Sequence, residues 1–118
     1  MGCVEDRLLL EARALVLADL SARQLATADA VSALEDACAS RLWWARQWSE
    51  GATYVAGLVA QDVQDALLGS RGRWPECLLC DDAPMHSLYI SPDLGGPDPV
   101  WVCEETGEVA AALGYLRA

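Results

Sequence analysis

The stretch Trp74-Pro75-Glu76-Cys77-Leu78-Leu79-Cys80, followed by His86 and by Trp101-Val102-Cys103, decides how the C-terminal part of this sequence folds. Three of the five cysteines and the single histidine lie in it. Thiolates and imidazoles are the ligands that a tetrahedral zinc ion takes, and a Cys-x-x-Cys pair offers two sulfurs to the same side of a cation. We therefore predict a Zn²⁺ site with Cys77, Cys80, His86 and Cys103 as its ligands.

The fourth ligand does not follow from the cysteine spacing alone. A four-cysteine ribbon would carry a cysteine three residues after Cys103, but Thr106 occupies that position. The prediction therefore takes His86 as the remaining ligand, at the edge of the first expected strand. The alternatives to His86 are Asp81, Asp82, Cys38 and Cys3.

The C-terminal part changes in composition from what precedes it. All five prolines follow residue 74, after Gly69-Ser70-Arg71-Gly72, which predicts a helical part at 1–70 and a zinc ribbon at 71–118, packed together as one unit. Residues 87–90 and 99–103 are rich in aromatic and β-branched residues, which predicts two strands. Residues 108–113 suit a third strand or a short helix. So few strands cannot bury a core unaided, so a metal would have to hold them.

The first 70 residues predict three antiparallel helices, and the whole chain an α+β fold. The expected helices span 4–24, then 28–49 with Thr27 as N-cap and Gly51 as the closing residue, then a third that Thr53 caps and Gly69 ends. Gly51 as a kink in one long helix is the alternative. The second helix has an apolar stripe at steps of three and four, formed by Val31, Leu34, Cys38, Leu42, Ala45 and Trp48.

The first expected helix is apolar in nearly every direction. Its leucines and valines do not gather on one face, and such a helix is usually covered on more than one side. In a chain of 118 residues, a second copy of the same chain is one candidate for that cover. Self-association is therefore one expectation.

Charge limits the classes of partner. The net charge is −10, and each part contributes −5, from ten acids and five arginines in residues 1–70 and eight acids and three arginines in residues 71–118. No lysine or arginine lies between residues 74 and 116, which disfavours nucleic acid because phosphate binding depends on such cations. No run of apolar residues is long enough to span a membrane, and the first residues do not form a secretory signal. We expect a cytoplasmic protein.

The last 45 or so residues resemble a zinc ribbon. Trp74-Pro75-Glu76-Cys77, His86 and Trp101-Val102-Cys103 are similar to the tail of small uncharacterised helical-plus-zinc-ribbon proteins of high-GC, actinobacterial-type bacteria. That pattern has a histidine three residues after its first cysteine, where this chain has Cys80, so one zinc ligand replaces another. The resemblance implies a fold and a metal, and it implies no activity.

These features favour a non-enzymatic protein-binding or assembly module, including a component of a larger complex or phage particle, with Trp43, Trp44 and Trp48 as candidate binding residues. The first alternative is a transcription-associated zinc-ribbon regulator, and the second is a small zinc-dependent enzyme. A redox Cys-x-x-Cys pair and a nucleophilic cysteine with His86 as its base are weaker interpretations, because neither has a supporting motif. Cys38, on the apolar stripe, is expected to be a buried free thiol.

Overall fold

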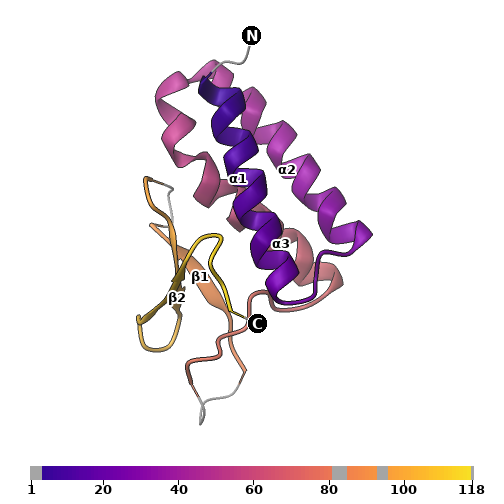
Figure 1. Ribbon diagram of the computed structural model, residues 1–118, viewed down its shortest axis with the longest axis vertical. Helices are drawn as coiled ribbons and strands as arrows, with labels where there is room; N and C mark the ends of the chain where they lie inside the picture. Colours follow the sequence, from indigo (N-terminus) through magenta and orange to yellow (C-terminus); the bar gives the residue numbers. More distant parts are fainter. Residues whose placement is uncertain (1–3, 81–84, 93–95, 118) are drawn as a thin grey trace.

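A computed structural model describes residues 4–80, 85–92 and 96–117 of the chain. Three helices come first and a small antiparallel sheet follows, which confirms the predicted α+β layout. Figure 1 shows the helices side by side, with the sheet against the lower half of α1. The elements are α1 (Val4–Ala22), α2 (Ala28–Gln47), the 3₁₀ helix η1 (Ser49–Tyr54), α3 (Val55–Ser70), β1 (Leu88–Ser91), β2 (Val100–Cys103) and β3 (Val109–Ala112).

The three helices pack against one another pairwise, and the apolar stripes explain how. On α1, residues spaced by three and four are buried, namely Leu9, Ala12, Val16 and Leu20. The predicted stripe of α2 is only partly correct: Leu34 and Ala45 are buried, but Trp48 is exposed. Small residues complete the contact, because Ala30 and Ala37 are buried as well. None of the helices in the described ranges is long and apolar enough to cross a membrane.

The junction between α2 and α3 differs from the prediction. Thr53 is not the N-cap of the third helix, since it lies within η1 and Tyr54 occupies the cap position. Gly51 lies in η1 too, where a Cβ would come within 2.6 Å of the Trp44 ring and 2.7 Å of the Trp48 ring. The two indoles therefore fill the space beside this turn, and only glycine lets the backbone approach them. Thr27 is the N-cap of α2, but its hydroxyl donates to Asp29 instead of capping the backbone.

The sheet is a meander in the order β1-β2-β3. Leu88 is paired with Cys103 and Ile90 with Trp101, and all four are buried, so one face of the sheet is turned toward the helices. Residues 109–112 form a strand, which settles the choice between strand and helix in this region. A bulge between Trp101 and Val102 shifts the register to β3.

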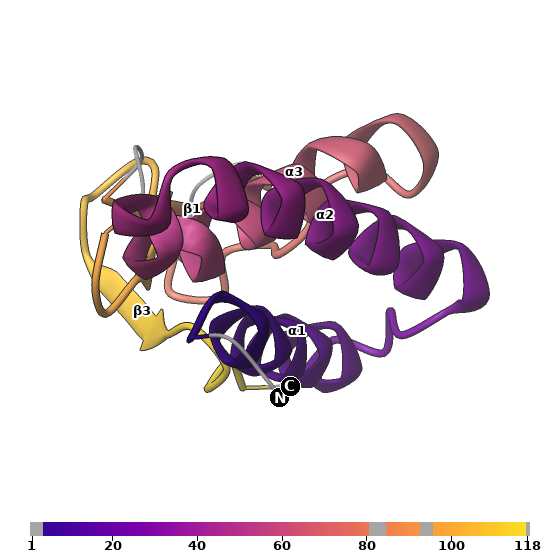
Figure 2. The same ribbon diagram turned by 90° about the horizontal axis from the view of Figure 1, so that it is seen from above.

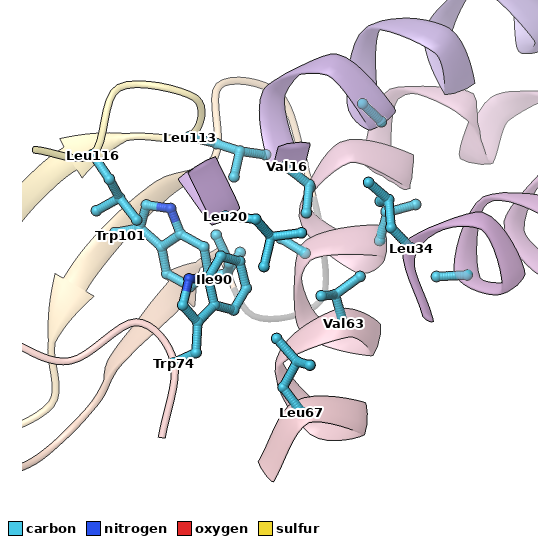
Figure 3. Packing of buried hydrophobic residues seen from close by; sticks show 14 of the residues in the cluster. Val16, Leu20, Leu34, Val63, Leu67, Trp74, Ile90, Trp101, Leu113 and Leu116 are labelled. Atoms are coloured by element: carbon cyan, nitrogen blue, oxygen red, sulfur yellow. The ribbon is translucent and has the colours of Figure 1, made fainter. Parts of the chain in front are cut away.

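A single hydrophobic cluster joins the helices to the sheet. Trp74 and Trp101 meet edge to face at its centre, with ring centroids 5.4 Å apart, an arrangement worth about 0.5–1.5 kcal/mol beyond the buried area. Figure 3 shows both rings facing Leu20 of α1, with Leu67 of α3 nearby. Both indoles thus lie at the interface between the sheet and the helices. The two predicted parts therefore share one core, and the boundary near residue 70 stays a prediction.

A buried carboxylate fixes the C-terminal segment onto α1. Asp19 accepts hydrogen bonds from Trp101 Nε1 (2.8 Å), from the backbone N–H of Gly114 (2.7 Å) and from that of Leu116 (3.0 Å). Its exposed fraction is 0%, so these three donors replace the water that a buried carboxylate loses. Figure 2, seen from above, shows β3 beside α1. The chain itself therefore covers a further side of α1, and self-association stays a prediction.

Candidate metal centre

Four donor side chains converge at one end of the sheet. The sulfurs of Cys77, Cys80 and Cys103 and one imidazole nitrogen of His86 all lie within 4.8 Å of one another. His86 and Cys103 are buried, and the other two cysteines are half-buried. The structure thus brings together all four residues that the sequence selects, and the cluster could hold a metal ion.

Backbone pairing places three of these donors. The N–H of Cys77 donates to the carbonyl of His86 (2.8 Å), and the N–H of Leu88 donates to the carbonyl of Pro75 (2.8 Å). Residues 75–77 therefore run antiparallel to residues 86–88. Because Leu88 pairs with Cys103 in the sheet, the end of β2 lies next to this short ladder.

Thr106 occupies the position at which a four-cysteine ribbon would have its fourth cysteine, and its backbone bonds to Cys103 instead. The N–H of Thr106 donates to the sulfur of Cys103 (3.4 Å), and Gly107 N–H donates to the Cys103 carbonyl (2.9 Å). Gly107 has a φ of 78°, which the turn requires and which suits glycine. This turn brings one sulfur, that of Cys103, to the cluster, and the fourth donor of the cluster is His86 instead of a residue at position 106.

The spacing of the donors fits a tetrahedral ion. With metal–sulfur bonds near 2.3 Å, two sulfurs of a tetrahedral site lie about 3.8 Å apart, and a sulfur and a nitrogen about 3.6 Å. The observed separations are 3.9 Å between the sulfurs of Cys77 and Cys80, 3.7 Å between those of Cys80 and Cys103, and 3.3 Å from His86 Nε2 to Cys103 Sγ. The three cysteines are free thiols, since a disulfide needs about 2.05 Å between its sulfurs.

The thiols differ in their readiness to lose a proton. Hydrogen bonding from Thr106 lowers the pKa of the Cys103 thiol to about 6, against the opposing effect of burial. The hydrogen bond with Cys103, together with burial, raises the pKa of the Cys80 thiol to about 12. Without a metal at neutral pH, Cys103 is thus the preferred thiolate, and Cys80 keeps its proton. A metal ion must displace that proton, so its binding weakens in acid.

The family of the "Domain of unknown function (DUF8819)" matches residues 5–113. The chain belongs to this family. The matched range runs from the second residue of α1 through the end of β3 and includes all four donors, so in this DUF8819 chain the four-donor cluster is part of the family domain. No curated protein and no solved structure matches the chain. The resemblance to zinc-ribbon proteins of high-GC bacteria therefore stays a prediction.

The other candidate ligands do not join the cluster. Cys38 lies half-buried on α2, and burial raises the pKa of its thiol to about 11, as expected of a free thiol in apolar surroundings. It is less buried than the sequence suggested. Asp81, Asp82 and Cys3 lie outside the described residues.

The three candidate binding tryptophans of the DUF8819 chain have different environments. Trp43 has 67% of its surface exposed, and Trp48 has 46%. Trp44 is half-buried, meets Trp48 edge to face at 5.3 Å and lies 5.8 Å from the guanidinium of Arg41. Trp48 also stacks on Tyr54 at 5.8 Å. Trp44 thus packs at the α2–η1 junction, whereas Trp43 and Trp48 are exposed.

Asp19 and Arg23 connect α1 to the C-terminal part, and neither residue was predicted from the sequence. Arg23 Nε donates to the carbonyl of Arg117 (2.7 Å), and one Nη donates to the carbonyl of Glu76 (2.8 Å), next to Cys77. A signal for Asp19 was present, because it lies three residues after Val16 on the stripe that begins at Leu9. A charged residue at a buried position of a stripe predicts a bonded carboxylate.

Proposed function

We propose that this protein is a non-enzymatic protein-interaction module whose C-terminal part is held by a structural zinc ion. The observation that carries the proposal is the complete set of four protein donors at tetrahedral spacing. A catalytic zinc site keeps one position open for water or substrate, whereas four protein ligands close the site. Three thiolates and one imidazole favour zinc over magnesium, calcium and manganese, which prefer oxygen ligands.

The role of the ion follows from the small size of the sheet. Each strand has four residues, and such a sheet is marginal in water unless something else supports it. Cys77, His86 and Cys103 come from three separate segments, so one ion would bind all three together. The ion supplies cross-linking, and the chain's own residues supply the protein contacts.

Cobalt substitution tests the closed site. Protein unfolded with a chelator and refolded with Co²⁺ should show the absorption of a tetrahedral ion with three thiolate ligands. His86→Cys should keep a tetrahedral spectrum and shift it toward four thiolates, because it exchanges one ligand for another. A five-coordinate spectrum, or one that changes when small anions are added, would mean that the metal site has an open position. That result would favour the alternative of a small zinc-dependent enzyme.

The interaction surface is proposed at the end of α2, where Trp43 and Trp48 are exposed. Large exposed aromatic side chains are the commonest anchors of protein interfaces. The occupant proposed is another protein, since the net charge of −10 opposes both nucleic acid and close approach of a second copy.

Matched variants test this surface. Trp43→Ala should abolish a quantitatively measured partner interaction, while Leu10→Ala, which removes a similarly exposed apolar side chain from α1, should leave it intact. Sedimentation over a wide concentration range would report self-association in the same samples. Equal loss in both variants, or no loss in either, would refute the role of Trp43. Retention on DNA that falls steeply with salt would favour the transcription-associated alternative.

A further inference from the structure

Three arginines gather where α1 ends, although they come from distant segments. Arg23 lies just after α1, Arg73 follows α3, and Arg117 lies near the C-terminus. Figure 1 shows the C-terminus beside the lower end of α1, close to the chain that leaves α3. The Arg23 side chain bridges the other two segments through its bonds to the carbonyls of Glu76 and Arg117.

Among the described residues, Arg23, Arg73 and Arg117 form no ion pair with a carboxylate, and neither does Arg7 on α1. Within residues 4–80, 85–92 and 96–117, ion pairs involve four of the arginines, namely Arg13, Arg41, Arg46 and Arg71. In a chain of net charge −10, acids outnumber arginines by more than two to one, so unpaired arginines close together are unexpected. The carboxylates of Asp19 and Glu76 attract the Arg23 guanidinium without pairing with it, so Arg73 and Arg117 are the members of this group that no described carboxylate neutralises.

A cavity of about 390 Å³ lies at this place. Arg23, Arg73 and Trp74 line it together with the apolar side chains of Ala22, Leu25 and Leu78. Such a combination of apolar wall and a few polar groups is typical of a small-molecule site. Its lining is assembled from the end of α1, the segment after α3 and the start of the metal-binding loop.

Trp74 provides a second, independent sign of a missing acceptor. Its side chain is 1% exposed, and its Nε1–H is a buried donor without a hydrogen-bond partner within the described part of the chain. Trp101, which packs against it, gives its own Nε1–H to Asp19. Buried donors are almost always bonded, so an oxygen acceptor beside Trp74 would complete a group that the chain leaves unsatisfied.

The backbone at the cavity is held in an uncommon conformation. Gln24, which lines the cavity, has a φ of 58°, in the left-handed region that glycine usually occupies. The N–H of Leu25 donates to the carbonyl of Leu20 (2.8 Å), which closes the end of α1 and fixes Arg23 at its last turn. Left-handed residues other than glycine are concentrated at ligand sites, where the surroundings maintain them.

We propose that this cavity binds a small organic oxyanion, a carboxylate or a phosphate monoester with an apolar body. The guanidinium of Arg73 pairs with the oxyanion, remaining N–H groups of Arg23 and the Trp74 indole donate to it, and the apolar body lies against Leu25 and Leu78. Arginine suits this task because its planar fork matches both carboxylate and phosphate. Glu76 also lines the cavity and opposes an anion, so it limits the affinity.

The test uses the metal-loaded full chain in chloride buffer at constant ionic strength. Phenyl phosphate and benzoate are titrated separately, with benzylammonium as the cationic probe of the same shape. Indole ¹H–¹⁵N resonances report binding, because Trp74 and Trp101 give separate signals. We expect saturable shifts of the Trp74 signal with one or both anions, a smaller response of Trp101, and no response to benzylammonium.

Variants connect that signal to the arginines. Arg73→Gln, at an exposed position, should weaken anion binding about tenfold, as expected for the loss of one charge-assisted contact. Arg7→Gln makes the same change of charge at an exposed position of α1 and should leave the affinity unchanged. Glu76→Gln should tighten binding, because it removes the opposing carboxylate.

The comparison of phenyl phosphate with benzoate identifies which oxyanion the cavity prefers, and preference for either one supports the proposal. No saturable shift with millimolar anion, or equal affinity in the Arg73→Gln and wild-type proteins, would overturn it. Salt-sensitive binding of DNA that depends on Arg73 while neither small anion binds would also overturn it, because the arginines would then serve a polyanion.

Discussion

The helical part and the C-terminal part of this protein are stabilised in different ways. Helices α1, α2 and α3 bury stripes of aliphatic side chains against one another, and the ion pairs that join them lie at partly exposed positions. The three strands have four residues each, with the four-donor cluster at one end and with Trp74, Trp101 and Asp19 at the side facing the helices, and we propose that they depend on these groups. Helical packing tolerates small changes, whereas the C-terminal part depends on a few groups with specific chemistry. Substitutions in the two parts should therefore differ in effect.

The largest expected difference follows from loss of the metal. Cys103→Ser removes the buried sulfur at the centre of the cluster, so the protein should lose its metal, and the amides of β1–β3 should lose protection from hydrogen exchange. The amides of α2 should stay protected, because its contacts are with the other helices. Cys38→Ser, which removes a half-buried thiol outside the cluster, should keep the metal. Loss of far-UV helicity together with the sheet would show that the two parts unfold as one unit.

The next effect concerns the carboxylate that joins the two parts. Asp19→Ala leaves three N–H groups without their acceptor and should lower the free energy of unfolding by roughly 3–5 kcal/mol. Asp36→Ala, an exposed acid on α2, should change it by less than about 0.5 kcal/mol. Denaturant titration of both variants checks the difference. Similar small effects would mean that Asp19 does not hold the C-terminal segment.

Gly114 and Gly107 test how much the close approach of the C-terminal segment to α1 contributes to stability. Gly114 has a φ of 95°, and a Cβ there would overlap Leu15 Cδ2 of α1, so Gly114→Ala should cost about 2–3 kcal/mol. Gly107 has a φ of 78° with open space around it, so Gly107→Ala should cost only about 1 kcal/mol. Thermal unfolding of the two variants gives the difference. Equal costs would show that backbone conformation alone matters and that the approach to α1 adds nothing.

The smallest expected effect lies between two helices. Arg41 makes two hydrogen bonds to Asp62 (2.7 and 2.9 Å) at a half-exposed position between α2 and α3. Because solvent screens such a pair, Asp62→Asn should cost no more than about 1 kcal/mol, and part of that loss should disappear in high salt. Denaturant titration at two salt concentrations measures both. A loss as large as that of Asp19→Ala would contradict the view that apolar packing holds the helices.

The sequence predicts the helices, the strands and the metal ligands because each has a local signal. Cys77, Cys80, His86 and Cys103 are reactive residue types at typical spacing, and the apolar periodicity of 4–24 and 28–49 marks two helices. The prediction of Thr53 as the N-cap of the third helix was wrong, although threonine is a suitable residue type for a cap. The close fit of Gly51 against the rings of Trp44 and Trp48 decides where the chain turns. That fit is a tertiary contact, which no local pattern records.

The contacts between the helical part and the C-terminal part could not be predicted from the sequence either, because they too are tertiary contacts. Asp19 and Gly114 are 95 positions apart, and Arg23 meets the carbonyl of Arg117 across 94 positions. Charge counting along the sequence also missed the group of Arg23, Arg73 and Arg117. Residues 74–116 contain no lysine or arginine. The fold nevertheless places arginines from outside this range next to its first residues.

The native mass of protein purified without chelators tests the central claim most directly, when hydrogen exchange is measured on the same sample. The account predicts one zinc ion per chain, with protected amides in β1–β3 that lose protection when the ion is removed. Protein that carries no metal and still protects those amides would contradict it, because packing against the helices would then suffice to hold the sheet.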